Sequence, residues 1–574
     1  MYREKTIILK NLHREIRKNI QKIYVISIIT IVSLLVLAPP LYIVFYVLID
    51  LQEVWGETFN QYIVGAGYWR FITRSVELSL RLAITTLIVD LLIGLPLSYF
   101  LARKKILARR FLEDVAVLPL VVPTSAYGFA ILMTWSNPSG LASFLGLSEG
   151  LIPQNSTISF LQVPTLLLLT HIALTLPYII RPLTATIETL GETYELVSRS
   201  LGASALTTFR RITLPIILPS LLSSSVLVLT RSLGETGATI IVAGVNITAS
   251  VAIVRLAGAM KLGLASLLAS LLIASTLALV LPTESISKKV AIRREVKPSR
   301  VEKVLLKLES NLATRKYIAY TTKSVLTIIL ALLTLAPIAA IVKVLIEYWE
   351  RDPYTGKIEG GVLYQVFGPS GYWTRILRAA ANSFLVASLA TLTAVYVSIL
   401  LFAAVRRSKL ASITRGIIRI PLIVPTSAQG LSSLLLYGRA GLNLAEPSIW
   451  LTVLTHISFT TPVVFETLMA TYETVDVDVL EDVARTLGAT PYDGLETITL
   501  PVLKKGIVAG SVLAFLGSLG ETGATMMVMG RDEMLTVLVV NMAEALAIPA
   551  ALFTSTLLLV YAVVALFAVR FLTQ

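Results

Sequence analysis

The residues best suited to chemistry in this chain are carboxylates that stand inside apolar sequence. The stretch SLGETGAT occurs twice, beginning at positions 232 and 518, and it places Glu235 and Glu521 among small residues. A carboxylate in such surroundings has to be paired, and Arg231, one helical turn before Glu235, is spaced to pair with it. Gly517 occupies the matching place in the second copy, so Glu521 needs another partner. We expect both carboxylates to serve helix packing and gating, with direct substrate contact as the alternative.

A second set of candidates consists of hydroxyls that follow prolines. VPTSAYG, from Val122, and VPTSAQG, from Val424, each place a proline inside an apolar run. A helix broken there frees backbone carbonyls, which must face protein or a water-filled space. The hydroxyls are suited to lining a path, and capping of the broken helix is the competing explanation. The residues concerned are Thr124, Ser125, Thr426 and Ser427.

The rest of the sequence excludes several classes of catalytic site. The chain has no cysteine, so it offers no thiol nucleophile, disulfide or cysteine-ligated metal. It contains no Gly-x4-Gly-Lys-Ser/Thr stretch, so it cannot hold ATP in a P-loop of its own. We expect His171 and His456 to bond a neighbouring helix, with a functional role at membrane depth as the alternative. The sequence predicts no catalytic residue, no metal site and no cofactor bound by this chain.

Composition places the chain in a membrane. Its residues are 55% hydrophobic and 15% charged, and the mean hydropathy is +0.79. Apolar runs of about 20 residues, the length that spans a bilayer as a helix, are numerous. Such continuous runs exclude transmembrane β-strands, which alternate in polarity over about 10 residues. The net charge of +14 comes from basic clusters at the edges of apolar runs, which indicates topology rather than a nucleic-acid partner.

The expected fold is therefore all-α, a polytopic protein of the cell membrane with about twelve transmembrane helices. The basic clusters place both termini in the cytoplasm by the positive-inside rule. Val301, Val304, Leu305, Leu308 and Leu312 have helical spacing, which indicates an amphipathic helix on the inner membrane surface or, alternatively, a partly ordered connector. The expected spans are 24–48, 71–101, 112–135, 158–180, 216–243, 253–282, 319–346, 373–405, 416–436, 449–470, 506–529 and 545–572.

Two polar segments between apolar runs are alike in length and pattern. The first docking segment, 192–215, reads ETYELVSRSLGASALTTFRRITLP, and the second docking segment, 478–501, reads DVLEDVARTLGATPYDGLETITLP. Each has a glycine suited to positive φ two residues before a good N-cap. We expect each to fold as a helix, a turn and a second short helix that offers side chains to a soluble partner; an ordinary cytoplasmic loop is the alternative. At an offset of 286 residues, 488 minus 202, the matched positions are Gly202 and Gly488, Ser204 and Thr490, and Pro215 and Pro501.

Much of the remaining sequence is duplicated in the same way. The triplet GYW at 67 recurs at 371, His171 recurs as His456, and we match the serines Ser75 and Ser383. Because each half has an even number of spans, we expect two parallel six-helix repeats related by an axis along the membrane normal. The predicted domains are a first half with a basic N-terminal arm, 1–282, a cytoplasmic basic linker, 283–316, and a second half, 317–574.

The docking segments resemble the cytoplasmic EAA loop of the permease subunits of ATP-binding cassette importers. That signature has a Glu-Ala-Ala start, a glycine six residues later and a final Leu-Pro. In the first segment Glu195 comes one place before the start, so either Glu192 or Glu195 meets the partner. The signature places are taken by Leu196, Val197, Ser198, Gly202, Leu214 and Pro215 in the first segment, and by Asp482, Val483, Ala484, Gly488, Leu500 and Pro501 in the second.

This resemblance implies a fused permease, similar to those of the ferric iron and thiamine importers. SLGETGAT is also similar to a stretch of the molybdate, tungstate and sulfate permeases, with Thr236 and Thr522 in the place of an aromatic residue. An oxyanion is therefore the favoured solute, and ferric iron, thiamine or a polyamine is the alternative.

The implied mechanism is alternating access driven by partners. Two copies of an ATPase subunit, which hold ATP and Mg²⁺, grip the docking segments, and an extracytoplasmic substrate-binding protein delivers the solute; membrane lipid surrounds the chain. The residues expected to couple the ATPases to the pore are Glu192, Glu195, Gly202, Ser204, Pro215, Glu481, Asp482, Gly488, Thr490 and Pro501.

Two hypotheses from other classes remain. An ion-coupled secondary transporter also has about twelve spans in parallel halves, and Asp90, Glu235 and Glu521 would be its coupling carboxylates. A membrane scaffold that transports nothing would need neither broken helices nor buried carboxylates. Co-purification with a nucleotide-binding subunit separates these hypotheses from the importer.

Overall fold

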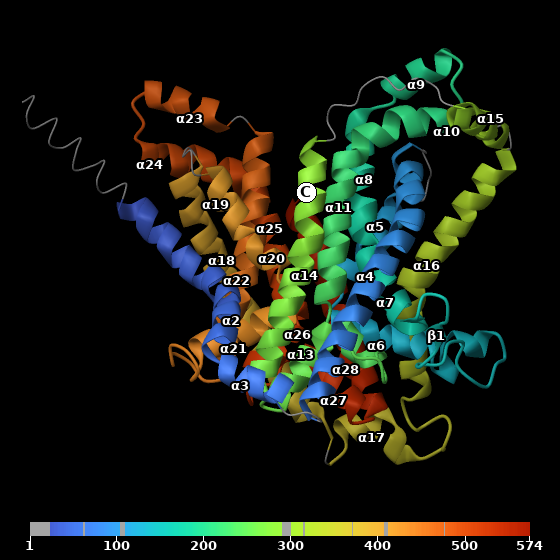
Figure 1. Ribbon diagram of the computed structural model, residues 1–574, viewed down its shortest axis with the longest axis vertical. Helices are drawn as coiled ribbons and strands as arrows, with labels where there is room; N and C mark the ends of the chain where they lie inside the picture. Colours follow the sequence, from blue (N-terminus) through green and yellow to red (C-terminus); the bar gives the residue numbers. More distant parts are fainter. Residues whose placement is uncertain are drawn as a thin grey trace, which may run out of the picture.

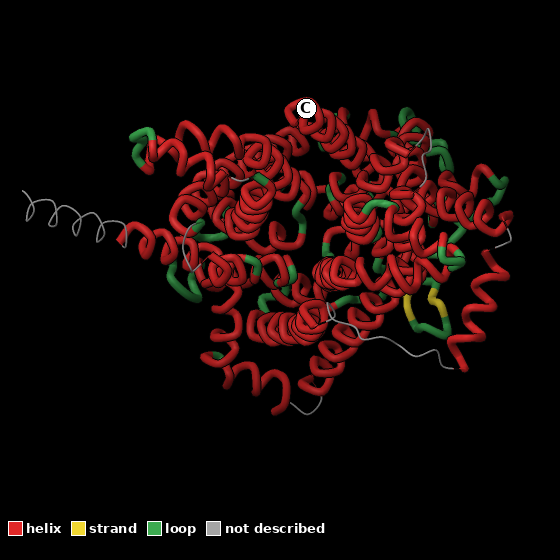
Figure 2. The backbone as a smooth tube through the Cα atoms, turned by 90° about the horizontal axis from the view of Figure 1, so that it is seen from above, coloured by secondary structure: helices red, strands yellow, loops and turns green. Residues whose placement is uncertain are grey.

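The computed structural model is built almost entirely of helices (Figure 2). It describes residues 23–60, 64–103, 109–289, 300–313, 316–369, 371–406, 411–475 and 477–573. The N-terminal arm, 1–22, and residues 290–299 of the linker, for which the sequence predicts basic cytoplasmic segments, lie outside these ranges. Within them, one short antiparallel strand pair is formed by β1 (Thr157–Ile158) and β2 (Val163–Pro164).

By length and composition, nine helices of the described ranges can cross a membrane. Two bent helix pairs raise the number of candidate spans to eleven. The chain is thus an all-helical polytopic membrane protein. The expected twelfth span falls on α28 (Ile548–Thr573), whose apolar part, Ile548–Val564, is a shorter helix than the nine.

Up to residue 289, the long helices alternate with short ones at both ends of the molecule (Figure 1). Four turns of π-helix extend or interrupt them. The elements are η1 (Ser33–Leu37), α2 (Ala38–Ile49), α3 (Leu51–Trp55), η2 (Gly56–Asn60), α4 (Val64–Arg103), α5 (Arg109–Val121), α6 (Thr124–Trp135), η3 (Pro138–Ala142), α7 (Thr165–Thr175), α8 (Pro177–Leu190), α9 (Thr193–Ser200), α10 (Ala205–Thr208), η4 (Phe209–Thr213), α11 (Leu214–Gly234), α12 (Gly237–Val242), α13 (Ala249–Gly258) and α14 (Leu262–Lys289).

The remainder begins with the expected linker helix, which forms over Arg300–Ala313, and continues in a similar order. The elements are α15 (Arg300–Ala313), α16 (Lys316–Glu347), η5 (Ile358–Gly360), α17 (Val362–Phe367), α18 (Trp373–Val405), α19 (Ala411–Ile418), α20 (Ile420–Ile423), α21 (Thr426–Tyr437), α22 (Ile449–Thr474), α23 (Val477–Thr486), α24 (Pro491–Gly494), η6 (Leu495–Thr499), α25 (Leu500–Gly520), α26 (Gly523–Val528), α27 (Leu535–Glu544) and α28 (Ile548–Thr573).

Proline breaks two of the expected spans, as the sequence predicts. α5 and α6 meet at an angle of 111°, and the helical segment Thr414–Ile423 meets α21 at 105°. Pro123 and Pro425 lie at the breaks, each with an extended ψ before the next helix begins. Because proline has no N–H and excludes its predecessor from the helical region, the ladder cannot continue through it.

Two spans that we expected to be continuous are also broken, so that expectation is wrong. α11 ends at Gly234 and α25 at Gly520, and the chain restarts as α12 and α26 after two residues. Glu235 and Glu521 lie in the breaks, with extended ψ of 122° and 132°. Apolar composition hid these breaks, because the glycines and threonines around each carboxylate keep the run apolar.

Three smaller corrections concern boundaries and matching. The fourth span begins at Thr165 rather than 158, because the strand pair occupies the preceding residues. The sixth expected span is two helices, α13 and α14, joined where Met260 has a positive φ of 60°. The serine that corresponds to Ser383 is Ser79 rather than Ser75, because Ser79 accepts a hydrogen bond from Ala249 N and Ser383 accepts one from Leu535 N, both at 2.8 Å.

The long helices α2 and α16 each pack against helices that are distant in the sequence. α2 lies against α21, and Tyr42 donates to the carbonyl of Ala440 at 3.1 Å. α16 lies against α5 and α6, and the hydroxyl of Tyr127 in α6 donates to the carbonyl of Leu333 at 2.6 Å. Helices from the N-terminal and C-terminal parts of the chain are therefore interleaved.

Both docking segments lie at the same end of the molecule, at the top of Figure 1. α9 and α10 form one pair there, and α23 and α24 form the other.

Candidate functional site

Each docking segment folds as the sequence predicts, with a helix, a turn and a second short helix. The turns are made by Gly202 and Gly488, whose φ angles of 91° and 97° are strained for any residue with a side chain. Ser204 Oγ accepts from Thr207 N at 3.1 Å, so it caps α10. In the second segment Thr490 Oγ1 accepts from Asp493 N at 3.2 Å while the Asp493 carboxylate accepts from Thr490 N, which is a capping box.

A buried carboxylate anchors the first docking segment to the end of α4. Glu195 accepts hydrogen bonds from the hydroxyl of Tyr99 at 3.0 Å, from Arg103 Nε at 3.2 Å and from Thr213 Oγ1 at 2.7 Å. The side chains of Arg103 and Glu195 are 7% and 9% exposed. Since a buried ion pair of this kind leaves an uncompensated charge when one member is lost, it ties α9 firmly to α4.

The second docking segment has the same anchor. Glu481 accepts from Arg406 Nη1 at 2.5 Å and from the hydroxyl of Thr499, and its side chain is 1% exposed. Arg406 directly follows α18, as Arg103 ends α4. The inward carboxylate is therefore the residue at 195 and 481, one place before the position that the signature gave to Asp482, whose side chain is 65% exposed.

Opposite the anchors, the docking segments present apolar side chains to solvent. Leu201 and Leu487 lie beside the two glycine turns and are 83% and 84% exposed. Exposed apolar groups gathered on a surface element mark a contact site for another protein. The other exposed members are Tyr194, Leu196, Val197 and Leu206 in the first segment, and Val479, Leu480, Val483 and Tyr492 in the second.

The four helix breaks meet in the middle of the molecule, at a contact that we call the central seam. It comprises Pro123, Thr124, Gly234, Thr236 and Gly237, and the matching Pro425, Thr426, Gly520, Thr522 and Gly523.

The seam has no room for larger side chains. A Cβ at Gly237 would lie 2.6 Å from both Thr124 Oγ1 and Thr522 Oγ1, and one at Gly523 would lie 2.8 Å from Thr236. The glycine backbone on each side of the seam thus touches a threonine side chain on the other side. Small residues allow this approach, and a methyl group at either glycine would force the halves apart.

The carboxylates of the two SLGETGAT stretches hold the seam together from within. Glu235 Oε1 accepts from Ala238 N at 3.0 Å, and Glu521 Oε1 accepts from Ala524 N at 3.1 Å, so each caps the helix that follows its break. The expected pair between Arg231 and Glu235 is present at 2.7 Å. Arg231 is also near enough to attract the Glu521 carboxylate across the seam, although the two form no ion pair among the described residues.

The two buried histidines complete the same structure. His171 bonds Ser232 Oγ at 2.8 Å and Thr239 Oγ1 at 3.0 Å, and His456 bonds Ser518 Oγ at 2.7 Å and Thr525 Oγ1 at 3.0 Å. These are the first and last residues of SLGETGAT, so the bond to a neighbouring helix that we expected is confirmed. The residues of SLGETGAT therefore hold the helix before each break against the helix after it.

The hydroxyls after the prolines divide into two kinds. Thr124 and Thr426 face the seam glycines, as the distances above show. The hydroxyls of Ser125 and Ser427 are buried and have no hydrogen-bond partner among the described residues, and neither does that of Thr522. Buried hydroxyls without a partner are uncommon in folded proteins, so these three are candidates for a functional role.

Sequence reasoning missed the residues that anchor the docking segments. Arg103 and Arg406 counted only as members of the basic clusters at the edges of apolar runs, and Tyr99, Thr213 and Thr499 were not singled out. The available signal was an arginine at the end of the second span in each half and a carboxylate in each docking segment.

Comparison of the sequence with known proteins identifies a family. Residues 94–291, from the end of α4 through the first docking segment and the seam, match the family described as binding-protein-dependent transport system inner membrane component. The chain belongs to this family. It is therefore a permease component, and the family is one of membrane components rather than of ATPases.

The relatives of this permease carry related names. The molybdenum transport system permease protein ModB of Mycobacterium tuberculosis is 33% identical over 31% of this chain and 66% of its own length. The molybdate/tungstate transport system permease protein WtpB of Pyrococcus abyssi is 32% identical over 32% of this chain and 66% of its own. The sulfate transport system permease protein CysT of Salmonella typhimurium is 28% identical over 39% of this chain and 81% of its own length. The alignment thus spans about two thirds of the length of the first two relatives.

Proposed function

We propose that this chain is the complete two-fold pore of an ATP-driven importer, with two permease halves, 1–282 and 317–574, fused through the linker 283–316. Two ATPase subunits bind the docking segments from the cytoplasm, where both termini also lie. A substrate-binding protein delivers the solute to the opposite end.

The observation that carries this proposal is the pair of docking segments. They lie at one end of the molecule, share the glycine turn and the N-cap, and bury Glu195 and Glu481 against equivalent arginines. A chain that binds one partner at one site has no need for two such elements. The relatives add support, because the aligned stretch is 66% of ModB but 31% of this chain, so this chain is about twice as long.

The geometry supports a transmission route from docking segment to seam. Glu195 ties the first segment to α4, and Ser79 of α4 bonds the first turn of α13. Ser250 of α13 in turn donates to the carbonyl of Glu235 at 2.7 Å. The second half repeats the route through Ser383 and through Thr536, which donates to the carbonyl of Glu521 at 2.8 Å. When ATP closes the ATPases, the docking segments move with them and the seam opens, since packed elements shift as rigid bodies.

We assign the solute to the oxyanions, with molybdate, tungstate and sulfate as the tested set. Support comes from the names of the relatives and from the hydroxyls of Ser125, Ser427 and Thr522, neutral donors suited to an anion's oxygens. Arg231 adds a cation beside the seam.

The test uses the chain with its ATPase and binding protein reconstituted in vesicles. Leu201→Asp and Leu487→Asp place a charge in the apolar contact of each docking segment and should each reduce retention of the ATPase. Leu546→Asp, equally exposed at 78% in the turn between α27 and α28, is the matched control and should retain it. ATP-dependent uptake of an oxyanion is expected, with ferric iron, thiamine and a polyamine as comparison solutes.

Two results would contradict the proposal. Uptake driven by an ion gradient without any ATPase would favour the secondary transporter, and retention of the ATPase by both docking variants would remove these segments as its binding sites.

A further inference from the structure

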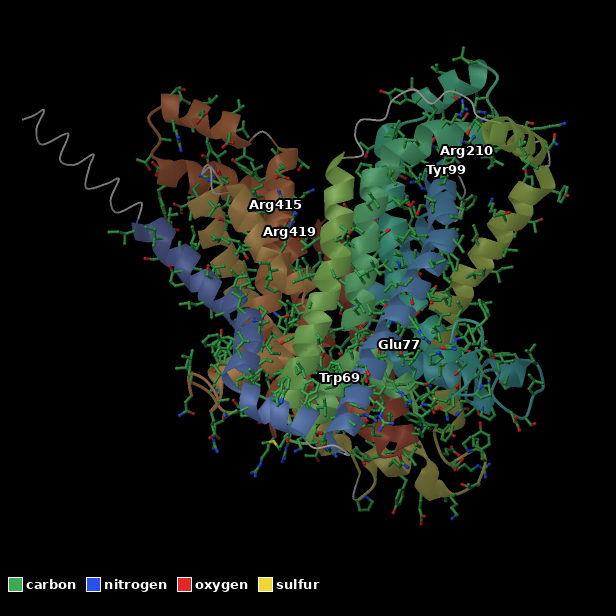
Figure 3. The ribbon with its side chains drawn as sticks, in the orientation of Figure 1. Trp69, Glu77, Tyr99, Arg210, Arg415 and Arg419 are labelled. Atoms are coloured by element: carbon green, nitrogen blue, oxygen red, sulfur yellow. The ribbon has the colours of Figure 1, made fainter. Side chains whose placement is uncertain are left out.

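The linker helix α15 is held against the first docking segment by ion pairs. Arg210 bonds Glu302 at 2.8 Å and also pairs with Glu309, while Arg211 bonds Glu302 at 2.6 Å. Thr207 adds a hydrogen bond to Glu309 at 2.8 Å. Figure 3 shows Arg210 beside α15, at the same end of the molecule as Tyr99 of the anchor. We expected α15 to lie on the membrane surface; in the structure its glutamates also contact the first docking segment.

The second docking segment cannot make this contact. At the offset of 286, Glu496 stands where Arg210 stands and Thr497 where Arg211 stands. The two glutamates of α15, Glu302 and Glu309, are attracted to the arginines of the first surface and would be repelled by Glu496 on the second. In the described ranges no ion pair joins Glu496 to another element. Charge therefore specifies which docking segment α15 joins.

α15 leads into a helix that reaches the seam by a separate path. α16 begins at Lys316 and packs against α5 and α6, the broken helix whose second part starts at Thr124. The hydroxyl of Tyr127 donates to Leu333 in the interior, and Lys343 Nζ donates to the carbonyl of Ser139 at 2.9 Å. α16 is thus fixed to the first half along much of its length, although it opens the second half of the sequence.

We propose that α15 and α16 form a second transmission route, from the first docking segment to the α6 side of the seam, and that α15 serves the first docking segment alone. Arg210 is the positioning residue of this route. It does not touch solute or nucleotide; it fixes α15 so that motion of α10 is passed along α16. This inference rests on the proposed function, and it makes the two ATPase sites unequal in what their movement does. Contact alone does not establish coupling, so the test has to measure it.

The test compares Arg210→Glu with its compensating variant. Arg210→Glu gives the first segment the charge of Glu496 and should release α15, which hydrogen exchange of 300–313 reports. Both ATPases should still bind, because Leu201 and Leu487 are untouched. Solute moved per ATP hydrolysed should fall about fivefold, the lower end of typical coupling between sites. Adding Glu302→Arg and Glu309→Arg should restore both the protection of α15 and the transport ratio.

The controls separate this inference from the proposed function. Glu496→Gln, at the matching place, should change neither the protection of 300–313 nor the ratio. Tyr127→Phe, at the far end of the route, should lower the ratio while α15 stays protected. Release of α15 with an unchanged ratio would overturn the inference and leave the importer intact. Failure of the unmodified chain to bind any ATPase would instead overturn the proposed function.

Discussion

The central seam and the docking end differ in how closely they follow two-fold symmetry. At the seam, SLGETGAT is identical in both copies. The histidine contacts and the carboxylate caps of the two copies agree within 0.1 Å: His171 with Ser232 and His456 with Ser518, Glu235 with Ala238 and Glu521 with Ala524. At the docking end the inner anchors are matched, but the outer faces carry opposite charges at 210 and 496. The two copies of SLGETGAT thus make matching contacts, whereas the two docking segments differ in the charge of their outer faces.

The largest effect is expected from removal of the buried carboxylates that anchor the two docking segments. Glu195→Ala and Glu481→Ala each leave a buried arginine unpaired, which should cost about 3–5 kcal/mol of unfolding free energy. Because the anchors are equivalent, the two losses should agree, and thermal unfolding in detergent measures them. A large loss at one site with none at the other would show that the anchors are not equivalent.

The glycine turns test the docking segments next. Gly488→Pro forces a φ near −65° on a residue that needs 97°, so it should abolish ATP-coupled transport while membrane insertion is kept. Gly202→Pro should do the same. Normal uptake by Gly488→Pro would count against the assignment of this segment.

Seam variants should act equally in the two halves. Gly237→Ala and Gly523→Ala each place a methyl group within 2.8 Å of a threonine of the other half, which should cost about 1–3 kcal/mol and slow transport. Gly416→Ala, where a Cβ meets nothing within 4 Å, is the matched control. Unequal rates for Gly237→Ala and Gly523→Ala would show that the seam is asymmetric.

The contact between α15 and the first docking segment should depend on pH. Hydrogen bonds from Arg210 and then Arg211 hold the pKa of Glu302 below its ordinary value, and a hydrogen bond from Arg210 does the same for the pKa of Glu309. The charged forms of Glu302 and Glu309 are thus favoured when α15 is bound to the first docking segment. The contact is therefore fully stabilised above the ordinary pKa of glutamate, and this stabilisation is lost as the pH falls through the lowered pKa values of the two residues. Hydrogen exchange of 300–313 should rise selectively in acid; a rise on going to alkaline pH would contradict this.

The smallest effects belong to the exposed carboxylates. Glu192→Ala and Asp482→Ala should change unfolding by less than about 0.5 kcal/mol, because neither side chain is buried. A loss as large as that of Glu195→Ala would mean that the inward carboxylate has been misassigned.

Local patterns predicted those parts of the molecule whose cause is local. The glycine turns, the caps at Ser204 and Thr490 and the breaks at Pro123 and Pro425 follow from residues within a few positions of each other. The breaks at Glu235 and Glu521 did not, because the sequence around them stays apolar and the distant His171 and His456 help to hold them. The anchors and the contact of α15 join residues about 90 positions apart, such as Arg103 with Glu195 and Arg210 with Glu302, and no pattern within one segment encodes them.

The most direct measurement uses the absence of cysteine from the chain. Leu201→Cys and Leu487→Cys, made singly and carrying a short cross-linker, should each join an ATPase subunit that is added from the cytoplasmic side of inverted vesicles. Cross-linking at both positions is the predicted result. The account would be contradicted if neither position were cross-linked, or if Leu201→Cys and Leu487→Cys could be reached only from opposite sides of the membrane.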